Sequence, residues 1–215
     1  MTENYLLNYL NFYIRIILTF DRGVQDMVED NLKKVLAEIK SSIQELDNQI
    51  KELKRDISKN SLVIGIMSGS LDRILGAFII ALGATAYDME VHMFFTFWAI
   101  AALRDPNKKA KKDFMSKMFG WMLPKGSKKL PLSSMNMGGI GPKMIRGLMK
   151  KKGVMSLEEM IKQAGELGVN IHICEMSMDL MGFKPEEMID YPGLDYVGVG
   201  TFIDLAHDAK QTIFL

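Results

Sequence analysis

The chain has 215 residues, 48% of them hydrophobic and 25% charged, and its formal net charge is +1. This composition is typical of a soluble globular protein, and the bulk charge predicts no particular partner. The single cysteine excludes an internal disulfide framework and any cysteine cluster for zinc or iron–sulfur, and the three scattered histidines indicate no metal site and no cofactor.

The N-terminal extension, residues 1–26, begins with an aromatic and aliphatic run that ends at residues 21–23. Its apolar stretch at 5–20 contains Arg15 and is shorter than the roughly 20 residues of a membrane-spanning helix. Two interpretations stay open. Residues 1–22 form an amphipathic helix that contacts a membrane surface or a partner, or they precede a natural start at Met27. No secretory signal is recognisable, so we expect a cytoplasmic protein, peripherally bound to a membrane under the first interpretation.

Residues 27–60 carry the clearest periodicity in the chain. Hydrophobic residues recur at alternating steps of four and three over about four heptads, which is the pattern of a coiled-coil seam. The a positions are Leu36, Ile43, Ile50 and Ile57, and the d positions are Leu32, Ile39, Leu46 and Leu53. Mostly isoleucine at a with leucine at d favours two parallel strands, so we expect a homo-oligomer. The alternative is a long helix that lies on its own domain.

From residue 61 onward, short apolar runs alternate with helical patterns. Buried strands are expected at 62–67, 90–96, 170–174, 196–199 and 211–214. Helices are expected at 72–87, 98–103, 156–167 and 201–209, with a short helix from residue 177. Strands that alternate with helices form a mainly parallel sheet, so we expect a doubly wound α/β domain over residues 61–215.

Residues 104–152 interrupt this alternation with a basic, methionine-rich segment. It holds 14 Lys or Arg residues against Asp105 and Asp113, which makes its net charge +12. Phe114 and Trp121 lie between the lysines, as in an interfacial amphipathic helix. The segment is interpreted either as a solvated insertion that covers the end of the sheet, or as a surface for a membrane or an acidic protein partner. It contains no recognisable nucleic-acid-binding module.

Cys174 lies where the third strand is expected to end and a helix to begin. Ligands bind at the carboxyl ends of the strands in open α/β sheets, and helix N–H groups favour a thiolate at such a place. A thiolate is the nucleophile required for persulfide formation or sulfur transfer. Neighbouring Glu175 and Asp179 oppose a second negative charge. A lone cysteine is also a common buried hydrophobic residue, so position alone leaves a structural role open.

Two further strand ends are expected to face the same edge. Ser68-Gly69-Ser70 follows the first strand and offers hydroxyls and backbone donors to an anion, and Thr201 follows the fourth strand. Neither stretch matches a dinucleotide- or nucleotide-binding pattern. His172 precedes Cys174 by two residues and therefore points to the same face of its strand. There it is either a base or a buried structural histidine.

Several separated motifs resemble those of the DsrE/DsrF-like family of sulfurtransferases and occur in the same order as in that family. The resemblance is to its larger branch, whose members are often called peroxiredoxin-like. The matching stretches are 67–72, 93–98, 130–133 with 135–137, and above all 173–181, which contains Cys174. The resemblance covers about residues 61–215. It implies a flavodoxin-like α/β sandwich with a five-stranded sheet, here preceded by the long helix. It also implies homo-oligomers that are often trimers, in contrast to the dimer that the heptads favour.

The resemblance further implies that Cys174 carries sulfur as a persulfide or a thiosulfonate, in relay with TusA-like or rhodanese-like proteins. Because the chain has no second cysteine, an internal disulfide is impossible, which argues against a two-cysteine peroxidase mechanism, and we expect a carrier rather than a multiple-turnover enzyme. Anion or substrate contacts are expected from Ser68, Gly69, Ser70, Glu175, Ser177 and Thr201, with His172 in support. The alternative function is a non-catalytic assembly or membrane-surface module with a structural cysteine.

Overall fold

A computed structural model describes residues 3–56, 58–112 and 114–215 of the chain. The chain divides into two compact units, Met1–Ile57 and Ser58–Leu215. Within the first unit, α1 (Glu3–Asp56) is one unbroken helix, which continues through the boundary at residue 26 between the expected extension and the expected coiled coil. In the part of the chain that is described, no helix is both long and apolar enough to cross a membrane.

The apolar seam predicted along α1 is exposed in the single chain. Leu32, Ile43 and Leu46 are 56–60% exposed, and the other described members of the seam are 48–49% exposed. Ile57 lies outside the described residues, as does the side chain of Leu53. An apolar stripe of this length is the surface that a coiled coil requires, and its pairing with a second copy stays a prediction.

The Ser58–Leu215 unit is built on a five-stranded sheet in which all neighbouring strands are parallel. The strands are β1 (Lys59–Ile66), β2 (Glu90–Phe95), β3 (Asn170–Cys174), β4 (Leu194–Val197) and β5 (Ala209–Phe214), in the order β4-β3-β2-β1-β5. The last six residues of β1 are all buried, as expected of a strand that is covered on both faces. The doubly wound parallel sheet that the sequence predicts is therefore confirmed.

Helices connect the strands. They are α2 (Leu71–Thr85), α5 (Leu157–Glu166), α6 (Glu175–Leu180) and α7 (Val199–Asp208), and the basic segment contributes α3 (Phe114–Met122) and α4 (Ile140–Lys151). Short 3₁₀ helices are η1 (Phe97–Leu103), η2 (Ser127–Lys129), η3 (Met137–Gly139) and η4 (Pro185–Glu187).

Several elements differ in type or boundary from the sequence expectations, and three of these differences lie close to the predicted site residues. Residues 98–103 are part of a 3₁₀ helix, and α6 begins at Glu175 rather than at residue 177. Val199 belongs to α7 rather than to the fourth strand, because Gly198 in extended conformation is the N-cap residue of that helix.

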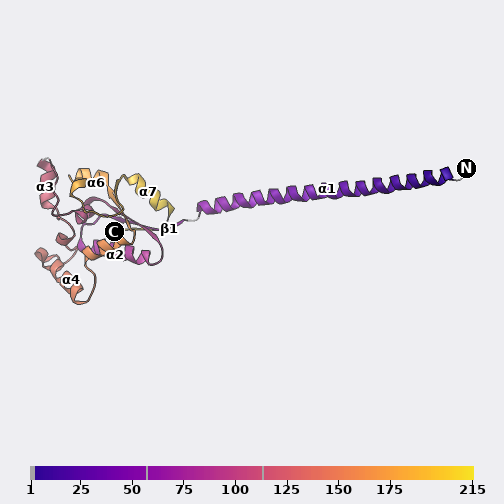
Figure 1. The fold of residues 1–215 in the computed structure, drawn as a ribbon. Helices are drawn as coiled ribbons and strands as arrows, with labels where there is room; N and C mark the ends of the chain where they lie inside the picture. Colours follow the sequence, from indigo (N-terminus) through magenta and orange to yellow (C-terminus); the bar gives the residue numbers. More distant parts are fainter. Residues whose placement is uncertain (1–2, 57, 113) are drawn as a thin grey trace. The chain divides into compact units, whose positions relative to one another are not determined.

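The two faces of the sheet are covered by different helices. One face carries the main core, in which Ile64 and Ile173 pack with residues of α2 and α5. Alternate residues of the same strands, among them Val63, Phe94 and Cys174, point to the other face, where α7 packs on β1 and β5. Figure 1 shows α2 and α7 on opposite sides of the sheet. Cys174 therefore lies on the same face as α7.

The strand order reverses between β1 and β5. The chain steps from β1 to β4 in one direction, then crosses back through α7 and adds β5 beside β1. In open α/β sheets, the crevice outside the carboxyl ends of the strands at such a reversal is a usual ligand site. The topology thus predicts a site at the ends of β1 and β5, in addition to the end of β3 that carries Cys174.

Candidate functional site

Cys174 is the last residue of β3 and the N-cap residue of α6. Its backbone is extended, with φ −67° and ψ 111°, and its side chain makes no capping hydrogen bond. It is paired with Val197 of β4. The side chain is only 2% exposed, so the thiol is enclosed in this conformation of the chain.

A buried pair of hydroxyls lies at the same end of the sheet as Cys174. Thr96 Oγ1 and Ser177 Oγ share a hydrogen bond of 2.8 Å, and both side chains are buried. The register that pairs Phe95 with Ile173 brings the following residues, Thr96 and Cys174, to neighbouring positions at the ends of β2 and β3. Of the predicted site residues, Ser177 is therefore brought to the Cys174 end of the sheet. Thr96 joins it although the sequence did not single it out.

His172 belongs to a hydrogen-bonded chain that crosses three strands. Its Nε2 lies 3.0 Å from His92 Nδ1, and its Nδ1 lies 2.5 Å from Asp195 Oδ1. Glu90 Oε1 lies 3.2 Å from His92 Nε2. Burial lowers the pKa of His92, Glu90 opposes this shift, and His172 adds to it. Both ring nitrogens of His172 are engaged, which favours the structural interpretation over that of a base for Cys174.

The Ser68-Gly69-Ser70 turn lines a separate cavity of about 700 Å³ at the ends of β1 and β5. Ser68 Oγ and Ser70 Oγ lie 2.9 Å apart, and Ser70 is the N-cap residue of α2 without a side-chain capping bond. A Cβ atom on Gly69 would lie 2.5 Å from the carbonyl oxygen of Trp98, so this close approach requires glycine. The cavity occupies the crevice that the reversal of strand order predicts.

The turn and the thiol do not share this cavity. β1 and β3 are separated by β2, and among the described residues those that line the cavity include neither Cys174 nor Thr201. Thr201 and Glu175 are exposed at the starts of α7 and α6. The structure therefore separates the predicted residues at Ser68–Ser70 from those at Cys174 and Ser177, and it brings Thr201 into neither group.

Sequence reasoning missed Thr96, His92 and Asp195. The available signal was the even spacing of these residues along the chain. His92 and Thr96, which directly follows β2, are four residues apart, and His172 and Cys174 on β3 are two apart. Residues on the same face of two strands can be predicted to touch only when the strands are known to be neighbours. Within the described ranges, no group of three or more His, Cys, Asp or Glu residues is placed to hold a metal ion.

Comparison with known proteins finds similar sequences and a similar solved structure. The protein YrkE of Bacillus subtilis, which is named as uncharacterized, is 44% identical over 153 residues, covering 71% of this chain and 94% of that protein. The sulfur carrier protein DsrE2 of Allochromatium vinosum is 31% identical over 164 residues, covering 74% of this chain and all of that protein. The crystal structure of the ychN protein from E. coli matches with a TM-score of 0.42 and 9% identity, over 72% of this chain and 99% of that one.

The match to a family model has the same extent as the α/β unit. The model of the DsrE/DsrF/DrsH-like family matches residues 58–214, from the start of the sheet unit to the last residue of β5. The matched region includes Cys174 and leaves out the long helix α1. The chain belongs to the DsrE/DsrF/DrsH-like family.

Proposed function

We propose that the protein is a sulfur carrier that holds sulfane sulfur on Cys174, as a persulfide or a thiosulfonate, and relays it to a partner protein. The observation that carries this proposal is the place of the sole cysteine, at the carboxyl end of β3 in a domain related to a protein named as a sulfur carrier. The proposed partners are small TusA-like or rhodanese-like proteins, which would receive or donate the sulfur.

The loading step needs no co-reactant beyond the donor. The Cys174 thiolate attacks a sulfane sulfur of a polysulfide or of a donor persulfide, and a new S–S bond forms. The S–S bond of the donor breaks, and the donor leaves as a thiolate with the electron pair of that bond. Delivery is the same exchange, with the acceptor thiolate attacking the outer sulfur on Cys174. With tetrathionate as donor, thiosulfate leaves and the adduct on Cys174 is a thiosulfonate.

Burial of the thiol sets a condition on this chemistry. A side chain that is 2% exposed is not reached by a protein partner, so exchange requires local opening. The segment placed to open is α6, which follows Cys174 directly and has six residues. A helix this short is marginal on its own and depends on packing, to which the Thr96–Ser177 hydrogen bond contributes.

The test is intact mass after incubation with polysulfide or tetrathionate. A persulfide adds about 32 Da and a thiosulfonate adds about 112 Da to the chain. We expect one adduct per chain on the wild type and none on Cys174→Ser, and transfer of the adduct to a TusA-like acceptor. A wild type that forms no adduct, or a Cys174→Ser variant that is modified equally, refutes the proposal.

A second candidate function is attachment to an anionic membrane surface, supported by exposed apolar faces on the two helices of the basic segment. On α3 the exposed apolar residues are Phe114, Met118, Trp121 and Met122, and on α4 they are Ile140, Met144 and Leu148. Their spacing is that of one helical face, and lysines flank both helices, which is the pattern of interfacial helices. Such attachment is compatible with sulfur carriage.

Vesicle co-sedimentation tests this second function. We expect binding to vesicles that contain phosphatidylglycerol, with loss at high salt and in the double variant Phe114→Ser, Trp121→Ser. Tyr87→Ser is the matched control, because Tyr87 is as exposed as Phe114 but lies beyond the end of α2, outside the basic segment. Equal binding by all three proteins contradicts attachment through this segment.

A further inference from the structure

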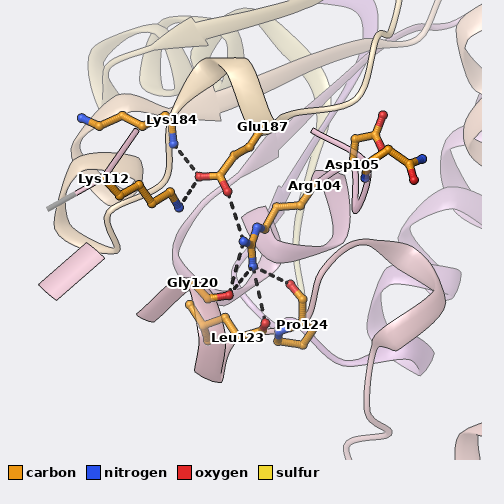
Figure 2. A network of polar contacts seen from close by, with 9 residues as sticks. Arg104, Asp105, Lys112, Gly120, Leu123, Pro124, Lys184 and Glu187 are labelled. Atoms are coloured by element: carbon orange, nitrogen blue, oxygen red, sulfur yellow. Dashed lines mark hydrogen bonds and ion pairs between the residues drawn. The ribbon is translucent and has the colours of Figure 1, made fainter. Parts of the chain in front are cut away.

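A buried ionic cluster lies where the basic segment begins (Figure 2). Arg104 Nη2 donates a hydrogen bond of 3.1 Å to Glu187 Oε2, and Lys112 Nζ forms an ion pair with Glu187 Oε1. The three side chains are only 5–7% exposed. The backbone holds the cluster in place, because Asp105 N–H donates to the carbonyl of Glu187 at 2.8 Å and Ile189 N–H donates to that of Leu103 at 2.9 Å.

The cluster contains more positive than negative charge. One carboxylate, Glu187, faces two cations and also accepts the backbone N–H of Lys184 at 2.8 Å. The other hydrogen-bond acceptors of the Arg104 guanidinium among the described residues are neutral carbonyl oxygens, those of Gly120, Leu123 and Pro124. A charge that is buried without a full counter-charge is costly, so the cluster favours a further anion.

Two buried nitrogens in the cluster also retain unused hydrogen-bond donor capacity. Within the described residues, neither Arg104 Nε nor Lys112 Nζ has a well-directed hydrogen-bond partner, although Lys112 Nζ is within ion-pair range of Glu187. Arg104 and Lys112 both lie over the ring of Phe183, at 5.0 and 5.4 Å from its centroid. The ring stabilises the cations but accepts no strong hydrogen bond, so donor capacity is left over.

These groups line a cavity of about 280 Å³. The other cations at its wall are Lys108, Lys109, Lys117 and Lys125, and its only acidic lining residues among those described are Asp105 and Glu187. The volume lies below the range of about 300–1,000 Å³ typical of drug-sized ligands, which suits a small ion with its waters. A metal cation is disfavoured by the charge, and an apolar ligand would leave the donors unpaired.

We propose that this cavity binds a small tetrahedral oxyanion with two negative charges, the class that includes phosphate, sulfate and thiosulfate. Lys112 Nζ and Arg104 Nε supply the buried donors, and the lysines at the rim supply the attractive field. The bound ion offsets the excess positive charge of the cluster and of the lysines at its rim, and it thereby holds the C-terminal end of α3, whose carbonyls Arg104 already binds, against η4. This inference is independent of the reactivity of Cys174.

Titration calorimetry of the full chain with sodium phosphate and sodium thiosulfate, against sodium chloride at matched ionic strength, tests the site. We expect one oxyanion per chain for the wild type and no saturable binding of chloride. Lys112→Met, which keeps the aliphatic stem over Phe183, should weaken binding by about tenfold or more through loss of a charge-assisted hydrogen bond. Lys162→Met is the matched control, because Lys162 is 80% exposed on α5 and does not line the cavity.

A second variant makes the test independent of folding damage. Glu187→Gln removes the buried negative charge, so it should tighten oxyanion binding about threefold or more, whereas damage to the fold would weaken it. If Lys112→Met does not fold, Lys117→Met and Lys125→Met at the rim replace it, with a smaller loss expected. Absence of saturable oxyanion binding by the wild type, or an equal loss in Lys162→Met, overturns the proposal.

Vesicles that contain phosphatidylglycerol separate a free ion from a lipid headgroup. Because Lys112 Nζ is buried, Lys112→Met should leave vesicle binding unchanged while it weakens binding of phosphate. Loss of vesicle binding with unchanged phosphate binding would overturn the assignment of a free oxyanion.

Discussion

Thr96 Oγ1 and Ser177 Oγ, 81 residues apart in the chain, share a buried hydrogen bond of 2.8 Å at the end of the sheet where Cys174 lies. The bond joins the residue after β2 to the middle of α6, the helix that begins directly after the thiol. It therefore stabilises α6 in the conformation in which Cys174 is buried. Exchange of sulfur at this thiol has to overcome that stabilisation. Substitutions in the hydroxyl pair therefore test directly how accessible the thiol is.

Thr96→Val removes one hydroxyl at nearly constant volume and leaves Ser177 Oγ buried without its partner. We expect a loss of about 1–3 kcal/mol in the free energy of unfolding, since an unpaired buried polar group has that cost. We also expect faster alkylation of Cys174 under native conditions, because α6 opens more often. Urea unfolding and the rate of reaction with iodoacetamide measure the two effects.

Thr201→Val is the control for this prediction, because Thr201 is exposed on α7. Its unfolding free energy should stay within about 0.5 kcal/mol of the wild type, as for ordinary surface changes, and its alkylation rate should not rise. A Thr96→Val protein that is as stable and as slowly alkylated as wild type contradicts the role of the hydroxyl pair.

Arg104→Met leaves the carboxylate of Glu187 buried with one cation instead of two and frees the carbonyls of Gly120, Leu123 and Pro124. Breaking a buried ion pair by removing one partner typically costs about 3–5 kcal/mol, so we expect a loss of that order in urea unfolding. Arg73→Met, an exposed position on α2, should change stability by less than about 0.5 kcal/mol. Equal stability of the two variants would show that the cluster contributes little to folding.

The stability of the sheet unit should fall on mild acidification because of His92. Burial is the main cause of its lowered pKa, so folding favours the neutral ring. In the unfolded chain, His92 has the ordinary histidine pKa of about 6.5. The stabilisation from neutral His92 is therefore complete above that value and is lost as pH falls through the lowered folded pKa.

Unfolding free energies at pH 7.5 and pH 5.5 measure this effect. We expect the difference between the two pH values to be smaller in His92→Gln than in the wild type. His207→Gln, at an exposed position on α7, should keep the difference of the wild type. The groups that face His92 are Glu90, His172 and Asp195, so Asp195→Asn is a useful further variant. An undiminished pH dependence in His92→Gln would assign the effect to other groups.

A lysine in the seam of α1 should disrupt self-association. Ile43 is 60% exposed in the single chain and occupies a predicted a position, where a buried charge disfavours a paired coiled coil. We expect Ile43→Lys to lower the molecular mass in solution, measured by sedimentation equilibrium, relative to the wild type. Ser42→Lys adds the same charge at the neighbouring position outside the seam and should leave the mass unchanged. Identical masses for wild type and Ile43→Lys contradict the coiled coil.

The strands of the α/β unit were predictable because each depends on a local pattern. Continuous apolar runs predicted β1 and β3 to within a few residues, and the Gly168 turn after α5 has the positive φ of 76° expected after a helix end. The fourth strand was shifted by two residues, since Val197 and Val199 have the same propensity and Gly198 decides between strand and helix only through its backbone conformation.

The side-chain networks were not predictable in the same way. His92 and His172 are 80 residues apart, and Arg104 and Glu187 are 83 residues apart. No local periodicity connects such pairs, because their contact depends on which strands are neighbours and in which register. The basic segment gave no sign in the sequence that Arg104 and Lys112 are buried, since its lysines as a group are typical of a solvated surface.

The sequence by itself determined the class of the domain, the position of the sole cysteine at a strand end and the concentration of positive charge in residues 104–152, because these follow from composition and local periodicity. Tertiary structure alone decided that Cys174 is buried at the same end of the sheet as the Thr96–Ser177 pair, while Ser68–Ser70 line a cavity at β1 and β5. The physical reason is strand order. Two loops at the same edge of a sheet meet only if their strands are neighbours, and β2 lies between β1 and β3.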